Sequence, residues 1–402
     1  MTKSNKAFAL AVACSAFFVA GILAAGFGPA LPDLAASTNS SLAGAGSLIT
    51  ALFGGALVSQ IFIGPLQDRF GVRPVLLLAL LVTAAGVVAS TLSDNLPAAL
   101  GFMLFAGLGD GVIIVGVNVM VAVVFASRSV MALNLSNMFF GVGAVTGPAI
   151  GAFFLSQWGS AIPVLWVASG ALALIALAVP LLRVPRSTGI PDRPEDEPQD
   201  NGARPVYASP ALWALGGLLL LYVGVEVGVG SWAITYLGRA ASVPPEQAAL
   251  AASGYWFALT AGRLTGAGIG VRLGSRALLT LALSGVLGGA LVLLLSGGNA
   301  AVMVGGLLLM GLSLGPVYPT AVARTAALFP YAPSRAGAAV MAMGSVGGMV
   351  LPWLLGSTLE WGGPYTSIMV AAAGALAMLV LHATPQLTEA RRARSDARAQ
   401  PG

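Results

Sequence analysis

The chain consists mainly of long apolar stretches, each near the length that a helix needs to cross a lipid bilayer. A transmembrane helix requires about 20 consecutive, predominantly apolar residues. The first stretch is too long for a simple secretion signal and leads directly into a second one, so we interpret it as a helix. We therefore predict an all-α integral membrane protein with twelve transmembrane helices. The predicted spans are 7–31, 42–66, 73–92, 97–125, 130–155, 161–182, 210–237, 246–270, 275–296, 300–326, 335–357 and 364–382.

Charged side chains are too scarce to cover a soluble protein of this size. They make up 8% of the 402 residues, against about 25% in ordinary soluble proteins. This scarcity argues against a soluble enzyme, so we expect no enzyme. Although the net charge is +5, no basic patch with interleaved aromatic residues is present, so we expect no nucleic-acid partner. Cys14 and His382 are the single cysteine and histidine, and no glycine loop precedes a lysine. We therefore expect no metal, no cofactor and no direct use of ATP.

The positive charges lie almost entirely on one side of the predicted helices. Cytoplasmic loops of membrane proteins carry an excess of Lys and Arg. On the other side, Arg239 alone is positive, and Arg263 lies near the basic end of its span. An even number of spans then places both termini in the cytoplasm. The remaining positive residues on that side are Lys3, Lys6, Arg69, Arg73, Arg128, Arg183, Arg186, Arg193, Arg204, Arg272, Arg276, Arg324, Arg335, Arg391, Arg392, Arg394 and Arg398.

A polar segment divides the chain into two similar halves. Residues 183–209 are rich in Pro and acidic residues, which is typical of a solvated linker. We predict one six-helix bundle over 1–182, a second over 210–385 and a basic cytoplasmic tail over 386–402. The halves also repeat: Gly71-Val72-Arg73 recurs as Gly274-Ser275-Arg276, and Gly143 and Pro148 recur as Gly347 and Pro352. Parallel six-helix repeats place a binding site between the halves, near the midplane.

Two acidic residues fall inside predicted spans, Asp110 and Glu226. A carboxylate is costly in lipid, so each should face a cavity or a partner. A buried carboxyl that can take up a proton suits proton coupling, and a structural tie between helices is the alternative role. Other polar or aromatic residues in the spans could contact a substrate or bond neighbouring helices. These candidates are Gln60, Asn118, Asn134, Asn137, Tyr222, Trp256 and Tyr318.

The segment Gly64-Pro65-Leu66-Gln67-Asp68-Arg69-Phe70-Gly71-Val72-Arg73 resembles the loop 2–3 signature of the major facilitator superfamily. Together with twelve spans and the 6+6 repeat, this resemblance covers essentially the whole chain. It implies secondary transport by alternating access. We expect a cytoplasmic gate that forms when the halves close on that side. Its residues would be Asp68, Arg69, Arg73, Arg263, Arg272 and Arg276.

Several segments further resemble the fucose/glucose/galactose:proton symporter branch. They include Leu133-Asn134-Leu135-Ser136-Asn137, Tyr222-Val223-Gly224-Val225-Glu226 and Gly315-Pro316-Val317-Tyr318-Pro319. The resemblance implies proton-coupled uptake of a sugar-like solute, with Asn134 in sugar binding. In that branch, carboxylates occupy the positions of Gly28 and Ile114. Asp110 or Glu226 would have to replace them as the proton carrier.

A rival signature runs through the fifth predicted span. Gly143-x-x-x-Gly147-Pro148-x-x-Gly151-Ala152 resembles the helix 5 motif of drug:proton antiporters, although its small residues also permit tight helix packing. Efflux of lipophilic compounds is therefore the alternative function. In either case we expect a monomer that binds a small molecule in a plasma membrane. The Ala-, Gly- and Arg-rich composition suggests a bacterial inner membrane.

Overall fold

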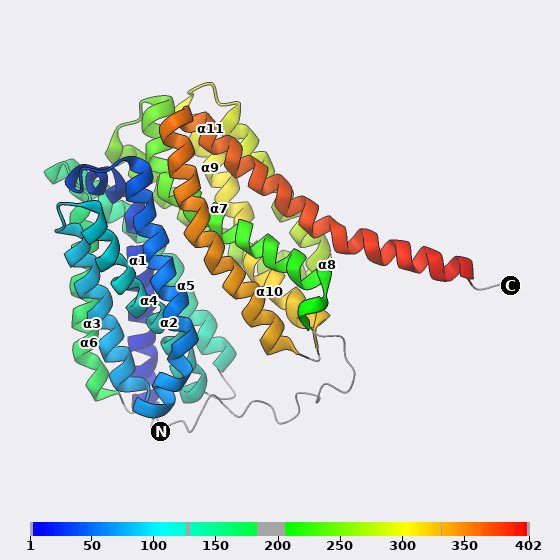
Figure 1. Cartoon of the computed structure of the whole chain (residues 1–402), viewed down its shortest axis with the longest axis horizontal. Helices are drawn as coiled ribbons and strands as arrows, with labels where there is room; N and C mark the ends of the chain where they lie inside the picture. Colours follow the sequence, from blue (N-terminus) through cyan, green and yellow to red (C-terminus); the bar gives the residue numbers. More distant parts are fainter. Residues whose placement is uncertain (1–2, 126–128, 183–205, 331, 400–402) are drawn as a thin grey trace.

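The computed structural model describes residues 3–125, 129–182, 206–330 and 332–399. The surroundings of Gly64 and the side chains of Lys3, Asp68, Ser129, Val130, Pro333, Ser334 and residues 384–399 lie outside this description. The ordered elements within these ranges are all helical (Figure 1). The elements are α1 (Lys3–Ser37), α2 (Leu42–Phe70), α3 (Val72–Thr91), α4 (Leu96–Phe125), α5 (Ser129–Trp158), α6 (Ile162–Ala178), η2 (Val179–Leu181), η3 (Val206–Ala208), α7 (Pro210–Ala241), α8 (Pro245–Leu294), α9 (Ala300–Leu314), α10 (Val317–Leu328) and α11 (Pro333–Ala399).

Ten helical spans among these residues are long and apolar enough to cross a membrane. Two of them, Pro245–Leu294 and Arg335–Ala383, have 50 and 49 residues. A straight helix of that length would extend about 75 Å, far beyond the ~30 Å hydrocarbon core. Each contains one glycine with a left-handed φ, 75° at Gly274 and 79° at Gly363. Figure 1 shows α11 rising in orange and descending in red from such a turn.

The predicted span 300–326 is divided in the structure. Helix α9 ends at Leu314 and α10 begins at Val317, with Gly315 and Pro316 between them. Proline has no backbone N–H to donate a hydrogen bond inside an α-helix, so the helix breaks at Pro316. The linker prediction, 183–209, lies outside the described residues except at its end, where η3 begins at Val206.

The recurring Gly-x-Arg segments adopt the same backbone conformation. Gly71, between α2 and α3, has φ 82° and ψ 161°, and Gly274 in α8 has φ 75° and ψ 162°. A side chain is disfavoured at such φ values, which explains why glycine occupies both turns. The two halves of the sequence therefore make the same turn at corresponding places.

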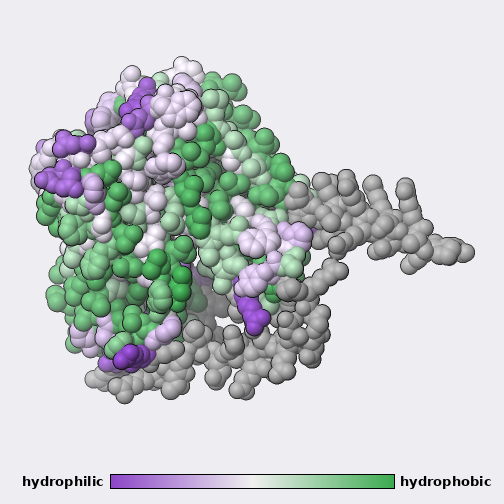
Figure 2. All heavy atoms as spheres, in the orientation of Figure 1, coloured by the Kyte–Doolittle hydropathy of each residue, from purple (hydrophilic) through white to green (hydrophobic). Residues whose placement is uncertain are grey.

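Two ends of the molecule can be distinguished by their charges. The basic end contains the turns at Gly71 and Gly274 and the start of α11, and it carries Arg69, Arg73, Arg272, Arg276 and Arg335. The opposite end contains the turns that follow α1, α3, α5 and α7, and it carries Asp33, Asp94, Arg239, Glu246 and Glu360. Figure 2 shows hydrophilic residues at the two ends and hydrophobic residues over the middle, as a lipid-embedded surface requires.

The buried apolar residues form two clusters. One consists entirely of residues from α1 to α6 and the segment that follows α6. The other lies mainly in α7 to α11 and adds only a few residues from the first half, among them Leu31, Ala45, Ile49 and Ala152. All of these added residues lie in the parts of α1, α2 and α5 nearer the opposite end. The halves therefore share a buried core on that side.

Direct contacts between the halves confirm this arrangement. The Thr50 hydroxyl of α2 donates to the Met349 carbonyl of α11 at 2.5 Å. The Ala43 amide donates to Glu360 Oε2 at 3.1 Å. The fully buried Trp232 ring lies against Gly46 of α2, and its Nε1–H donates to the Pro352 carbonyl at 2.8 Å. By contrast, Ile61 and Phe62, further along α2 toward the basic end, are 68% and 61% exposed.

Candidate functional site

An ion pair lies in the middle of the second half. Glu226 is the seventeenth residue of the 32-residue helix α7, at its middle. Its Oε1 accepts a hydrogen bond from Nη2 of Arg263, on α8, at 2.9 Å. The Glu226 side chain is 10% exposed, whereas that of Arg263 is 34% exposed. Opposite charges at this depth stabilise each other, because either one alone in the apolar interior would be costly.

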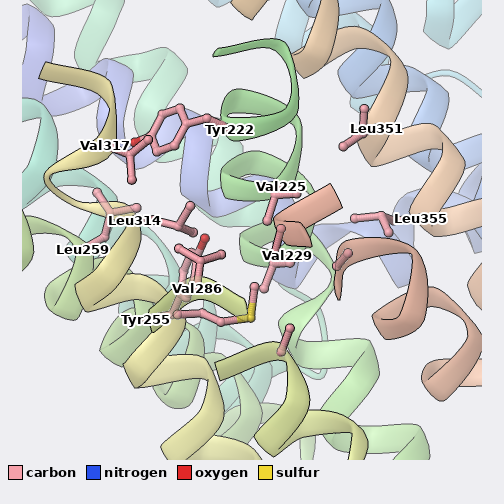
Figure 3. Packing of buried hydrophobic residues seen from close by; sticks show 14 of the residues in the cluster. Tyr222, Val225, Val229, Tyr255, Leu259, Val286, Leu314, Val317, Leu351 and Leu355 are labelled. Carbon is pink, nitrogen blue, oxygen red and sulfur yellow. The ribbon is translucent and has the colours of Figure 1, made fainter. Parts of the chain in front are cut away.

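Tyrosines from three helices surround this pair. Tyr222 lies one helical turn before Glu226 on α7 and shares its face. The Tyr222 ring packs against Tyr318 of α10, with centroids 5.9 Å apart. The Tyr255 hydroxyl of α8 donates to the Glu226 backbone carbonyl at 2.9 Å. Figure 3 shows Tyr222 near Val317, at the start of α10, and Tyr255 lower in the same cluster, near Val286.

Two buried polar atoms near the pair make no hydrogen bond of standard geometry to a described residue. They are the Tyr222 hydroxyl and Nε1 of Trp256. The Trp256 ring lies against Gly230, one turn beyond Glu226 on α7. The Tyr222 hydroxyl nevertheless interacts with the side chains of Glu226 and Arg263. Buried polar groups are normally hydrogen-bonded, so Nε1 of Trp256 is the candidate for contact with water or a ligand.

The position of Arg263 differs from our sequence-based expectation. We grouped Arg263 with Arg272 and Arg276 in a gate at the basic end, but its guanidinium is bound to Glu226 within the membrane region. Glu226 and Arg263 both fall inside predicted spans, and opposite charges at such positions generally pair. The sequence therefore contained a signal for this ion pair. Arg272 and Arg276 are exposed at the basic end.

The first half contributes amides. Asn137 Nδ2 on α5 donates to Asn118 Oδ1 on α4 at 3.3 Å and to the Leu133 carbonyl at 2.8 Å. Asn118 Nδ2 in turn donates to the Ile114 carbonyl at 2.9 Å. Asn134, one turn away, is exposed. The structure thus brings Asn118 and Asn137 together. The side-chain amides of Asn134 and Asn137 are exposed and can form further hydrogen bonds.

These amides and the ion pair lie at a similar depth, just beyond the contacts between the halves. Gly141 of α5 lies against the Thr260 side chain of α8, and Gly28 of α1 lies against the backbone of Gly230 and Ser231. Moving one turn toward the basic end leads from Gly141 to Asn137 and from Thr260 to Arg263. Because α5 and α8 run in opposite directions, Asn137 and Arg263 come to face the same space.

Asp110 and Gln60 do not join this group. Asp110 is partly buried on α4 and makes no hydrogen bond or ion pair with the described residues. The glycines on either side pack tightly against α3 and α2: Gly109 lies against Thr83, and Gly111 lies against Ser59. Gln60 on α2 is partly buried.

Arg69, Arg73, Arg272 and Arg276 of the expected gate lie at the basic end. The Arg69 guanidinium lies 5.2 Å from the centre of the Phe70 ring. Arg73 is partly buried, while the Asp68 side chain lies outside the described part of the chain. The salt bridge found among the described residues is the one between Arg263 and Glu226. The gate remains a prediction for a conformation in which the basic ends approach each other.

The structure gives physical reasons for two unusual features of the sequence. A Cβ at Gly28 would lie 3.0 Å from the Ser231 carbonyl oxygen, so an aspartate at that position would require the backbone of α7 to shift by a few tenths of an ångström. Gly143, Gly147 and Gly151 lie against Phe18, Ile22 and Pro29 of α1. The antiporter-like signature thus serves the close packing of α1 on α5.

Comparisons with known proteins assign the chain to a broad group. The sequence profile of the Major Facilitator Superfamily matches residues 13–239. An uncharacterized MFS-type transporter of Yersinia pestis is 25% identical over 312 residues, which cover 76% of this chain and 77% of that protein. The 4-hydroxybenzoate transporter PcaK of Acinetobacter baylyi is 30% identical over 141 residues, which cover 35% of this chain and 30% of that protein.

Solved structures show the same fold at low sequence identity. The D323A mutant of the nucleoside transporter NupG aligns with a TM-score of 0.76 and 13% identity, covering 94% of this chain and 98% of that one. A bacterial homolog of the human lysosomal transporter Spinster, in an inward-facing and occupied conformation, aligns with a TM-score of 0.69 and 15% identity. That alignment covers 97% of this chain and 98% of the homolog.

Proposed function

The chain belongs to the Major Facilitator Superfamily and is a multi-pass membrane transporter, and we propose that it couples proton entry to the uptake of a sugar-like polar solute. The Glu226–Arg263 ion pair carries this proposal, because it offers an ionisable carboxylate at the middle of the membrane. Glu226 is the proton carrier in this scheme, with Asp110 as the second candidate. The named substrates of the relatives differ, so the substrate class is taken from the site.

We count α8 and α11 as two crossings each, which gives twelve helices in two six-helix bundles. The basic end is then cytoplasmic, as the positive-inside rule requires, and the membrane is a bacterial inner membrane. In this topology the contacts of Trp232, Thr50 and Glu360 with their partners lie at the outer end, which supports an inward-facing state. Transport requires a second state in which the outer contacts break and the Asp68, Arg69 and Arg73 loop meets Arg272 and Arg276. The protein would perform this cycle as a monomer.

Substrate contacts in this proposal come from both bundles. Asn118, Asn134 and Asn137 can bond hydroxyl groups, and the partly buried Tyr318 ring can pack against the apolar face of a sugar. Tyr222 and Trp256 are 0% and 5% exposed here, so their rings would contact a solute only in another state of the cycle. Gln60 is a further candidate on α2. Most of these groups lie on the basic side of the contacts between Gly141 and Thr260, so a bound solute would be covered from outside.

A reversible disulfide tests alternating access. In a Cys14→Ser background, Thr50→Cys combined with Met349→Cys should form a disulfide that holds the outer end closed. Uptake of labelled sugars into cells should stop on oxidation and return on reduction, while each single variant keeps transporting. Continued uptake by fully cross-linked protein would reject the mechanism.

Labelling tests the orientation independently of any substrate. Ile61→Cys, in the same Cys14→Ser background, replaces a side chain that is 68% exposed beyond the contacts between the halves. A membrane-impermeant maleimide should modify it in inside-out vesicles much faster than in intact cells. Faster labelling in intact cells would place the basic end outside and reverse the proposed topology.

Ligand stabilisation separates uptake of polar solutes from efflux of lipophilic compounds. Purified protein should be stabilised against heat by sugars or sugar derivatives, because the amides and tyrosines provide hydrogen-bonding groups. Stabilisation by lipophilic cations alone would favour the efflux alternative. The α5 signature no longer distinguishes the two functions, since its glycines serve packing against α1.

A further inference from the structure

Arg263 already holds a carboxylate, that of Glu226, through one hydrogen bond of 2.9 Å. A guanidinium has five N–H donors in a planar fork, which fits the two oxygens of a carboxylate. About a third of the Arg263 side chain is exposed (34%), although the residue lies within a membrane span. The Arg263 guanidinium is therefore an accessible cation, and its partner in this structure is the carboxylate of Glu226 from the same chain.

The net charge of the site depends on the ion pair and on the titratable groups around it. The described titratable groups that face Glu226 and Arg263 are the hydroxyls of Tyr222, Tyr255 and Tyr318, from α7, α8 and α10. The neighbouring parts of α1 and α11 contribute Gly28, Leu351 and Leu355, which carry no charge. When Glu226 is ionised, its charge balances that of Arg263. When Glu226 takes up a proton, Arg263 remains as a net positive charge in the middle of the membrane.

An unpaired charge at this depth is disfavoured on the order of a hundredfold. An anionic group from a solute would restore the balance by taking the place that Glu226 occupies beside Arg263. Asn137 faces the same space from α5, as the Gly141 and Thr260 contact indicates, and its amide can bond a hydroxyl group. The site then holds a cation on one side and amides on the other.

We propose that the solute is a hydroxylated monocarboxylate of sugar size, whose carboxylate binds Arg263 in exchange for Glu226. This inference rests on the proposed function and narrows its substrate from a sugar-like solute to a sugar acid. The loaded site contains protonated Glu226 and a paired Arg263, and the empty site contains the Glu226–Arg263 pair. Both states are neutral, so one proton and one anion cross together without net charge.

Calorimetric titration of the purified full chain in detergent tests the exchange. The probes are D-glucuronate and two neutral counterparts, D-glucuronamide and D-glucose. At neutral pH, D-glucuronate should bind at least tenfold more tightly than either neutral compound, and its binding should strengthen as pH falls because Glu226 takes up a proton. Equal binding of the acid and the amide, or no binding of the acid, would overturn the proposal.

Two variants distinguish substrate exchange from a structural role of the pair. Glu226→Gln frees Arg263, so it should bind D-glucuronate at least tenfold more tightly than the wild type and without pH dependence. Arg263→Gln should remove the preference for the acid over the amide. Arg335→Gln, which removes a positive charge at the basic end, is the control and should match the wild type. A purely structural ion pair predicts that both site variants weaken acid and amide alike, and this result would overturn the exchange.

The outcomes separate this inference from the proposed function. If D-glucose or D-glucuronamide binds as well as the acid and is accumulated, the substrate is a neutral sugar, and only the exchange is wrong. If the Thr50→Cys and Met349→Cys disulfide leaves uptake unchanged, alternating access itself fails. A proteoliposome assay adds a further criterion: uptake of D-glucuronate should generate no membrane potential, and a potential that follows uptake would contradict neutral loading.

Discussion

The two halves of the molecule present different chemistry to the space between them. The second half contributes the Glu226–Arg263 pair, three tyrosines and the buried Trp232. The first half contributes glycines at the contacts and amides beyond them, among them Gly28, Gly141 and Asn137. The two halves therefore differ in chemistry: the second holds charge, and the first provides close packing and amide hydrogen bonds.

The largest effect is expected at the contact between the halves. Trp232→Ala removes a fully buried indole that packs against Gly46 and Gly356 and bonds the Pro352 carbonyl. Such a loss costs about 3–5 kcal/mol, so thermal unfolding should occur at clearly lower temperature. Trp361→Ala, at a ring that is 75% exposed, is the control and should change stability by less than about 0.5 kcal/mol. Equal shifts in both variants would contradict a role of Trp232 in joining the halves.

Coupling should depend on the charged half. With one proton per solute, a pH difference of one unit supports about tenfold accumulation. Glu226→Gln cannot exchange a proton, so accumulation of labelled solute in proteoliposomes should fall to equilibrium while exchange across the membrane continues. Wild-type uptake should rise as the external pH falls, since protons enter with the solute. Glu246→Gln, at the start of α8, is the control. Unchanged accumulation and pH dependence in Glu226→Gln would reject Glu226 as the carrier.

The amide half should affect affinity more than coupling. Asn137→Ala removes a side chain that bonds Asn118 and faces the same space as Arg263. One such hydrogen bond contributes about 0.5–1.5 kcal/mol, so the dissociation constant measured by titration should rise by up to about tenfold. Asn95→Ala, at the opposite end, should leave it unchanged. Loss of accumulation with normal affinity would instead place the coupling in the first half.

The smallest effect is expected at Asp110. This residue makes no ion pair with the described residues, and glycines on both sides pack against α2 and α3. Asp110→Asn should therefore keep the accumulation ratio of the wild type in the same proteoliposome assay. If accumulation disappears in this variant but persists in Glu226→Gln, Asp110 carries the proton and the comparison of the halves reverses.

The helical membrane fold and the family could be predicted because they depend on local patterns. Apolar stretches specify spans, arginines mark one end, and the segment from Gly64 to Arg73 indicates the superfamily. The candidate site could be predicted only in part. Tyr222 and Glu226 are four residues apart on one helix, so their shared face follows from the sequence. Arg263 is on another helix, and its partner depends on how α7 packs against α8.

What the sequence alone determined is the membrane-spanning helical architecture, the repeated glycine turns and the short list of polar residues inside the spans. These features follow from properties of single segments: apolar length, charge and backbone freedom at glycine. The tertiary structure decided that Arg263 pairs with Glu226, that Asn137 meets Asn118, and that the hydrogen bonds described between the halves lie at the end opposite the basic one. Each of these contacts depends on which helices pack against each other. Helical periodicity shows which residues share one face of a helix, but it does not show which helix lies against that face.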